Sequence, residues 1–409
     1  MNEEISETQT GFRKNYGTWD NIHTLRQLIE KTKEYRIPLF LCMIDIQKAF
    51  DRVHHVAIWE SLRKIGVHPQ LIHLLRSIYE NSTSSLQINE AKVPITIQRG
   101  VRQGDVLSPQ LFSIVLDLAM KKLDWSSTGI RIDGTYLSHI LYADDAVLVA
   151  PNKRTLRRMI KEFMAACSTV GLNINMAKCE YLHNQNDDSP LKFNNVQLAP
   201  KPQVTYLGVT ISMPLNWDKE VSRRISSGWC AYNDYRNFFK TQSIPMKMKR
   251  KLFNVAVLPR LIYASESWAL PNTAKDRLRV TQRKMERSML NCRIQDRFPN
   301  AGIRRITGLN DVCREAAFSK IKFCSRLSHL APSRWSLRLT NWCPYNRKRS
   351  AGRPSVRWKD DLVAATQAAN RTRQRVRARP APIRGEQYLS ASRDPAIWRH
   401  IRDHHIEMI

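Results

Sequence analysis

The chain has 409 residues, enough for two or three domains, and its 42% hydrophobic and 25% charged residues exclude a largely disordered protein. Lysine and arginine number 66 against 36 aspartates and glutamates, which gives a formal net charge of +30. Two-thirds of that excess, +20, lies in residues 271–409, and so basic a region favours a polyanionic partner such as nucleic acid.

The first half of the chain predicts helices alternating with strands. Six apolar residues, Leu39–Ile44, predict a buried strand that ends at Asp45. Ser108 followed by Pro109 predicts a helix start, and the apolar residues on both sides of Asp144-Asp145 predict a hairpin. Hydrophobic periodicity predicts the other elements: helices at 20–35, 54–65, 69–80 and 153–170, a hairpin across 86–97, and strands near 172–183 and 203–212.

The second half predicts mainly helices. Their expected ranges are 218–241, 245–265, 272–292 and several within 301–340. Asp360 and Asp361 predict an exposed helix start. Alternating arginines from Arg371 to Arg379, followed by Pro380-Ala-Pro382, predict an exposed, mobile segment, and 347–354 predicts a basic linker.

No targeting or membrane segment is predicted. The N-terminus lacks the pattern of a secretory signal, and no apolar run approaches the roughly 18 residues of a membrane helix. The eight cysteines contain no C-x-x-C pair, which indicates reduced thiols. Cys313, Cys324, His329 and Cys343 could form a metal site, but their spacing matches no zinc motif. We expect an intracellular protein, nuclear or nuclear and cytoplasmic, without membrane contact.

Three aspartates are placed so that they could converge. Asp45 ends one apolar strand, and Asp144 and Asp145 occupy the turn between two others. Most Asp-Asp turns are simply solvated, but buried carboxylates need a balancing charge. If the strands lie side by side, the three carboxylates form a site for two divalent cations about 4 Å apart, the arrangement used in phosphoryl transfer. Oxygen ligands suit Mg²⁺, with Mn²⁺ as an alternative.

Five segments in order resemble the motifs of one polymerase family. They are Phe40–Asp51, Arg99–Pro109, Leu141–Asp145, Gly171–Lys178 and Tyr206–Gly208. With Gln9-Thr-Gly-Phe-Arg13 and, more weakly, Gly352–Asp361, the chain resembles the reverse transcriptases of non-LTR, LINE-like retrotransposons of the RTE type. In that family the fingers begin well before Gln9 and an endonuclease lies upstream. The resemblance therefore predicts an N-terminally truncated part of a longer element protein.

The resemblance also implies roles for individual residues. Asp45, Asp144 and Asp145 would hold the metal ions, with the Ile46 carbonyl as a further ligand. Phe50 would exclude a 2′-hydroxyl, and Gln103 and Gly104 would contact the incoming nucleotide and the template. Lys178 would be catalytic at the leaving pyrophosphate. Tyr206, Leu207 and Gly208 would form the primer grip. Plainer alternatives stay open: core packing for Phe50, a solvated Lys178 and a buried turn at 206–208. Asp51 is expected to pair with Lys48 or to cap a helix.

We therefore expect an α+β fold, a right-hand polymerase palm of antiparallel sheet and helices with partial fingers, a helical thumb and a basic tail. The expected domains are 1–212 for the fingers remnant and palm, 213–292 for the thumb, 293–346 for a helical basic region and 347–409 for a partly flexible tail. The expected function is RNA-directed DNA synthesis that uses an RNA template, a DNA primer or target and deoxynucleoside triphosphates. The sequence does not tell which protein partners, if any, the chain has. The alternatives are a catalytically inactive nucleic-acid-binding remnant and an RNA-templated RNA polymerase, against which Phe50 weighs.

Overall fold

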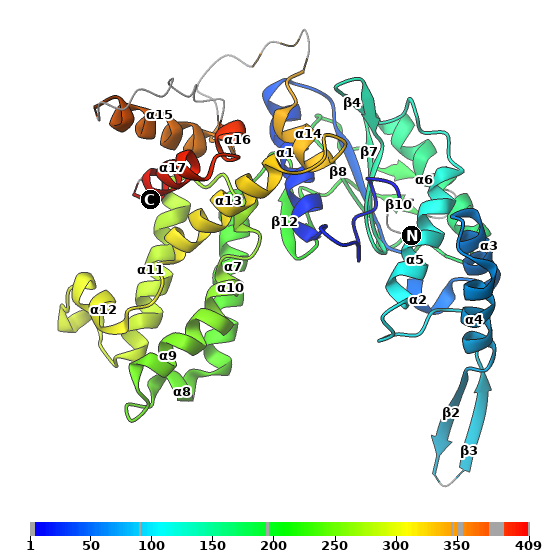
Figure 1. Ribbon diagram of the computed structural model, residues 1–409, viewed down its shortest axis with the longest axis horizontal. Coiled ribbons are helices and arrows are strands. Elements are labelled where there is room, and N and C mark those ends of the chain that lie inside the picture. The colour runs from blue at the N-terminus through cyan, green and yellow to red at the C-terminus, as the bar shows by residue number, and fades with distance from the viewer. Residues whose placement is uncertain are drawn as a thin grey trace. The chain divides into compact units, whose positions relative to one another are not determined.

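The computed structural model describes residues 5–89, 91–193, 196–344, 347, 349, 355–375 and 388–407. The chain divides into two compact units (Figure 1). The first unit contains the residues up to Leu207, Ser212–Pro214 and those between Ser333 and Arg349. The second contains Gly208–Ile211, Leu215–Pro332 and the part after Ser350. The chain therefore passes between the units more than once, first in the hairpin of strands β11 (Gln203–Tyr206) and β12 (Val209–Ser212).

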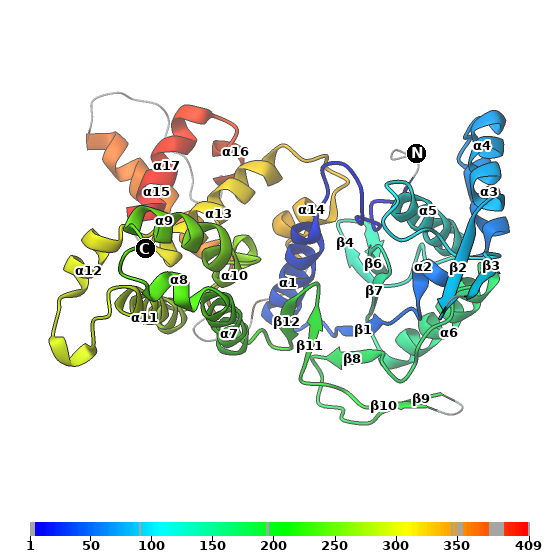
Figure 2. The same cartoon turned by 90° about the horizontal axis from the view of Figure 1, so that it is seen from below.

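A four-stranded antiparallel sheet, in the order β6-β7-β1-β8, forms the centre of the first unit (Figure 2). Its strands are β1 (Phe40–Ile44), β6 (His139–Tyr142), β7 (Asp145–Ala150) and β8 (Glu180–His183). All five residues of β1 are buried. β1 lies between two other strands, and both of its faces are covered. This explains why the sequence of this strand is apolar without interruption, as expected.

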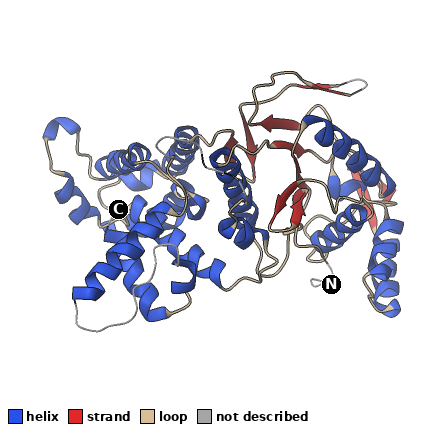
Figure 3. Ribbon diagram, turned by 90° about the horizontal axis from the view of Figure 1, so that it is seen from above, coloured by secondary structure: helices blue, strands red, loops and turns tan. Residues whose placement is uncertain are grey.

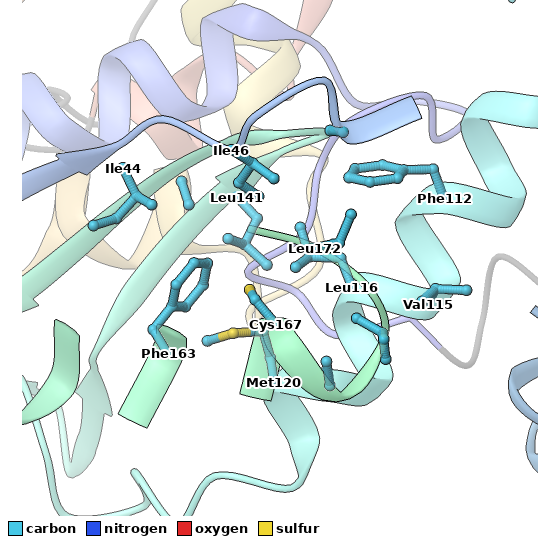
Figure 4. Packing of buried hydrophobic residues seen from close by; sticks show 14 of the residues in the cluster. Ile44, Ile46, Phe112, Val115, Leu116, Met120, Leu141, Phe163, Cys167 and Leu172 are labelled. Carbon is cyan, nitrogen blue, oxygen red and sulfur yellow. The ribbon is translucent and has the colours of Figure 1, made fainter. Parts of the chain in front are cut away.

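Helices pack on this sheet and complete the first hydrophobic core. α6 (Lys153–Thr169) packs on β1 and β7, α5 (Ser108–Lys121) packs on α6, and α3 (His55–Lys64) packs on α5. The core side chains that Figure 4 labels include Phe112 and Leu116 from α5, Phe163 and Cys167 from α6, and Ile44 and Leu141 from the sheet. This packing holds the end of β1 beside the start of β7, which follows directly on the turn from β6.

The remaining elements of the first unit are short, apart from α1. They are α1 (Thr18–Glu34), α2 (Ala49–Arg52), α4 (Pro69–Glu80), β2 (Thr83–Ile88), β3 (Ala91–Thr96), β4 (Ile130–Ile132), β5 (Thr135–Leu137), β9 (Leu191–Lys192), β10 (Gln197–Leu198) and α14 (Trp335–Asn341). α1 contacts both β6 and α14. His23 Nε2 lies 2.8 Å from Thr340 Oγ1, and Lys31 donates to the carbonyls of Thr340 and Trp342. Polar residues of α1 are buried because partners cover more than one of its faces.

The second unit is built almost wholly from helices (Figure 3). They are α7 (Trp217–Asp234), α8 (Arg236–Lys240), α9 (Met246–Leu252), a π-helical turn (Phe253–Val257), α10 (Leu258–Leu261), α11 (Asn272–Met289), α12 (Asn300–Thr307), α13 (Val312–Ser328), α15 (Asp360–Arg375), α16 (Tyr388–Ala391) and α17 (Pro395–Glu407), with 3₁₀ turns at Ser265–Ser267 and Ile294–Asp296. Among the aromatics of 229–239, Tyr232 and Phe239 stack at 4.7 Å in the buried core, whereas Tyr235 is exposed. No helix within the described residues is long and apolar enough to cross a membrane.

Several expected elements differ from those observed. Only 180–183 of the strand expected near 172–183 is a strand, because 172–179 forms a loop that bonds to the chain after β1. The helix expected at 245–265 contains the π turn, since Pro259 in the first turn of α10 has no N–H for the residue four positions earlier. The helix expected at 218–241 ends at Asp234 and resumes at Arg236.

The C-terminal expectations also need correction. α15 continues to Arg375, so the start of the expected mobile segment is helical, while 376–387 lie outside the described residues. Asp361 is not merely part of an exposed helix start. Its carboxylate accepts from Lys320 Nζ at 2.6 Å and lies 3.4 Å from His405 Nε2. Although burial alone would raise the pKa of Asp361, the Lys320 ammonium and the His405 contact hold it well below its usual range.

Candidate active site at the β6–β7 turn

The strand register brings the three predicted aspartates to one end of the sheet. β1 and β7 pair antiparallel up to Ile44 opposite Ala146, so the next position on each strand carries Asp45 and Asp145. Asp144 lies in the turn between β6 and β7. Ile44 and Ile46, on either side of Asp45, are buried and lie near Leu141 in Figure 4. The apolar neighbours fix the backbone and leave the carboxylates at the sheet end.

The carboxylates interact electrostatically with one another. Asp45 and Asp144 are half-buried, and Asp145 is exposed. Burial and the charge of Asp45 raise the pKa of Asp144. Burial and the charges of Asp144 and Asp45 raise the pKa of Asp145 to about 6. The charge of Asp45 contributes to both shifts, so its carboxylate lies near those of Asp144 and Asp145, as the strand register requires.

Metal ligation by these residues stays a prediction. Within the described ranges, no group of three or more His, Cys, Asp or Glu side chains is arranged to hold a metal ion. The backbone near Asp45 is nevertheless available. Ile46 bridges Ile174 through bonds made by the flanking residues, Gln47 N–H to Asn173 O and Asn175 N–H to Asp45 O, both at 2.8 Å. In this pairing the Ile46 carbonyl points away from Ile174.

The loop that carries Lys178 is attached to the chain beside Asp45. Its backbone supplies the two bonds to Gln47 and Asp45, and Lys178 N–H donates to Asn175 O. The Lys178 side chain itself is exposed, so it fits either a solvated lysine or one that reaches a bound substrate. Cys179 is buried beside Asp45, and burial raises the pKa of its thiol to about 11.

The loop that carries Gln103 packs on the helical turn after Asp45. Gly100 N–H donates to Val53 O at 2.8 Å, and Val101 N–H donates to Phe50 O at 2.7 Å. Gln103 Nε2 donates to Asp51 at 3.0 Å. Asp51 therefore pairs with Gln103, where pairing with Lys48 or a helix cap was expected. Gly104 has φ +91°, and nothing lies within 4 Å of the position that a β-carbon would take, which suits close approach of a ligand to the backbone.

Phe50 lies partly buried above the core. Its ring stacks on Phe112, with centroids 5.0 Å apart and planes 18° apart. Core packing is thus part of its role. An additional contact with a substrate sugar stays a prediction.

The expected primer grip is a tight turn. Leu207 and Gly208 have φ of +43° and +75°, the pattern of a two-residue hairpin turn between β11 and β12. Tyr206 is buried in the first unit, where its hydroxyl accepts from Asn21 Nδ2 at 3.2 Å. Burial raises the pKa of Tyr206, with a further contribution from Asp145. Tyr206 therefore lies near Asp145, and its role at the primer stays a prediction.

Two supporting residues were missed in the sequence. Asn21 on α1 also donates to Leu141 O at 3.0 Å, and His55 Nε2 donates to Gly100 O at 2.9 Å. Asn21 is a polar residue in a helix with an apolar face, and this is only a weak sign in the sequence that its side chain has a buried partner. His55 offers none, because a histidine at a helix start is usually solvated.

Comparison with known proteins identifies the family. The model of the reverse transcriptase (RNA-dependent DNA polymerase) family matches residues 1–211, just over half of the chain. An uncharacterized transposon-derived protein of Caenorhabditis elegans is 31% identical over 243 residues, which are 57% of this chain and 86% of that protein. The chain therefore belongs to the reverse transcriptase family, and the expected polymerase class is confirmed.

Other relatives come from mobile elements. A Pol polyprotein from the retrotransposable element R2 of Nasonia vitripennis is 30% identical over 41% of this chain and 16% of its own length. The RNA-directed DNA polymerase of the element jockey from Drosophila funebris is 25% identical over 70% of this chain and 32% of its own length. These matches confirm the kinship with non-LTR retrotransposons. The chain spans only a sixth to a third of these two proteins.

Among solved structures, apo telomerase from Candida tropicalis matches 81% of this chain and 57% of its own chain at 14% identity, with a TM-score of 0.41. The mixed α and β architecture with an antiparallel sheet follows from the strand pairing itself and confirms the expected fold class.

Proposed function

We propose that this chain extends a DNA primer on an RNA template and that Asp45, Asp144 and Asp145 form its catalytic centre. The observation that carries the proposal is the strand register, which brings three carboxylates to one end of the paired strands β1 and β7. Three like charges held together by buried strands need a compensating cation. Family membership supplies the reaction.

We propose Mg²⁺ as that cation, with Mn²⁺ as a substitute. The donor set fits, because carboxylate and carbonyl oxygens are the ligands of hard divalent ions. Bound there, two such ions would neutralise the charge on the attacking and leaving oxygens of the transferred phosphoryl group. The residues of the chain would hold the nucleotide: Phe50 beneath the sugar, Gln103 and Gly104 beside the base pair, and Lys178 near the pyrophosphate.

The proposed substrates are deoxynucleoside triphosphates, an RNA template and a DNA primer or target. The excess of +20 in residues 271–409 supports a nucleic acid backbone as partner of the second unit. A protein that acts on chromosomal DNA has to reach it, so we propose nuclear localisation. Residues 213–292 would serve as the thumb.

The test is primer extension by the full chain, with Asp144→Asn as the variant. Extension should fall by roughly a thousandfold or more, because removal of a charge from the ion clamp affects the transition state directly. Asp188→Asn is the matched control, since Asp188 is an exposed acid of the same unit away from the turn. Unfolding temperature and duplex binding should not change in either variant.

The same assay separates the alternatives. Equal extension by Asp144→Asn and the wild type would refute the catalytic assignment. Duplex binding without extension by the wild type would identify an inactive nucleic-acid-binding remnant. Preferential use of ribonucleotides would identify an RNA polymerase.

A further inference from the structure

Gln9, in the Gln9–Arg13 segment, makes an unusual contact with the turn that carries the aspartates. Its side chain is fully buried. Gln9 Oε1 accepts from the Ala143 N–H at 3.1 Å, and Gln9 Nε2 donates to the Ala143 carbonyl at 3.3 Å. One side-chain amide thus bonds both backbone groups of the residue immediately before Asp144.

Ala143 needs such support because of its backbone conformation. Its φ is +55°, a left-handed conformation that costs an alanine roughly 1–2 kcal/mol. The strain persists only where surrounding contacts hold it. A glutamine amide suits the task, since it offers a donor and an acceptor together, whereas a carboxylate only accepts.

The neighbours of Gln9 fix the position of its amide. Gly11 N–H donates to Gln9 Oε1 at 3.0 Å. A β-carbon on Gly11 would lie 2.2 Å from the Ala143 nitrogen, so only glycine permits this approach. Thr10 N–H donates to Leu141 O at 3.0 Å, and Leu141 N–H donates to Thr8 O at 2.8 Å. The segment therefore adds strand-like pairing to the free edge of β6.

We propose that Gln9 is a positioning residue that sets the backbone of Ala143 and thereby the direction of the Asp144 and Asp145 carboxylates. The inference rests on the proposed catalytic role of that turn. Gln9 touches the turn backbone and acts on the reaction only through the two aspartates.

The experiment compares Gln9→Met with Asn184→Leu in the full chain. Asn184 is a matched control because its amide also bridges backbone groups in the first unit, accepting from Leu39 N–H at 2.9 Å and donating to Ile37 O at 2.8 Å, at the opposite end of β1 from Asp45. Gln9→Asn is the second variant. It keeps an amide that is one methylene shorter, and it serves if Gln9→Met fails to fold.

Three quantities are measured: hydrogen exchange of the peptide 141–146, Mn²⁺ affinity by electron paramagnetic resonance, and primer extension against Mg²⁺ concentration. In the Gln9 variants the Ala143 amide should exchange roughly tenfold faster through loss of its partner. Mn²⁺ affinity should fall, and kcat should fall roughly 10- to 100-fold, as expected for misplaced catalytic groups. Asn184→Leu should change none of the three beyond its effect on stability.

The outcomes separate the inference from the proposed function. Unchanged exchange at 141–146, or unchanged Mn²⁺ affinity despite faster exchange, would overturn the positioning role. If the wild type does not extend primers, the proposed function fails, but exchange and Mn²⁺ binding still decide the role of Gln9. Equal losses in Asn184→Leu would reduce the effect to general destabilisation.

Discussion

At the residue scale, Phe50 combines core packing with a position five residues after Asp45. Phe50→Val should admit ribonucleotides at least about tenfold more readily, because the smaller side chain leaves room for a 2′-hydroxyl. It should also lower stability by about 1–3 kcal/mol through loss of the stack on Phe112. Incorporation of ribo- and deoxynucleotides is measured beside urea unfolding. A loss of stability with unchanged sugar discrimination would leave packing as the only role of Phe50.

A second residue-scale feature is the buried ion pair of Glu286 with Arg283 in α11. Both side chains are largely buried, and Gln282 Nε2 donates to Glu286 at 3.1 Å. Burial raises the pKa of Glu286 to about 7, although Arg283 and Arg304 oppose the shift. The same burial lowers the pKa of Arg283. Desolvation of this pair therefore outweighs its attraction.

The stability of the protein should depend on pH through Glu286. A folded-state pKa above the unfolded value means that the folded protein binds more protons between about pH 4.5 and 7. Stability contributed by Glu286 is therefore lost as pH rises through that window, by up to about 3 kcal/mol. Glu286→Gln should remove this component, so the free energy of unfolding of the wild type minus that of the variant should fall from pH 5 to pH 8. A flat difference would show that the pKa is not raised.

At the element scale, long apolar patterns were sufficient to predict structure. Leu39–Ile44, the helix from Ser108 and the hairpin around Asp144 appear as expected within a residue or two. The convergence of Asp45 with the turn also followed from strand pairing. Segments whose conformation is fixed by backbone hydrogen bonds to a distant part of the chain could not be predicted from the sequence. The loop at 172–179 is apolar enough for a strand, but its partners are two backbone groups beside Asp45, and no sequence period encodes them.

The loop of Gly100 and Gly104 gives an element-scale prediction. Both glycines have φ near +90°, but a β-carbon on Gly100 would lie 2.8 Å from the Asp51 carbonyl oxygen, whereas one on Gly104 meets nothing within 4 Å. Gly100→Ala should therefore detach the loop from α2 and lower stability by several kcal/mol. Gly104→Ala should cost only about 1–2 kcal/mol of backbone strain. It should nevertheless raise KM for the incoming nucleotide, since the proposed contact is there. Similar thermal unfolding of the two variants would contradict the difference in packing.

At the scale of the whole molecule, the most distant contacts were the least predictable. The sequence suggested one helical region at 293–346, whereas in the structure Ser333–Arg349 belongs to the first unit. Polar contacts between residues more than 300 positions apart help to attach this segment to α1. Ser336 Oγ donates to Asp20 at 2.7 Å, and Arg349 lies 2.9 Å from Glu34. Hydrophobic periodicity describes the face that a helix buries, and it carries no information about which distant segment supplies a polar partner.

The last prediction tests this division of the chain with one ion pair in each unit, each of which contains a buried basic side chain, Arg334 or Lys320. Arg334 lies over the Tyr16 ring at 3.2 Å and 3.6 Å from Asp20, so Arg334→Met should leave Asp20 poorly compensated and destabilise the first unit by about 3–5 kcal/mol. Asp361→Asn should do the same to the second unit, because Lys320 would lose its partner. Hydrogen exchange should accelerate in α1 and α14 for the first variant and in α13, α15 and α17 for the second. Arg305→Met, at an exposed arginine of α12, is the control and should change neither set. If Arg334→Met loosened α13 while α1 kept its protection, the segment after Ser333 would belong to the second unit, and the polar contacts with α1 would not be what holds it.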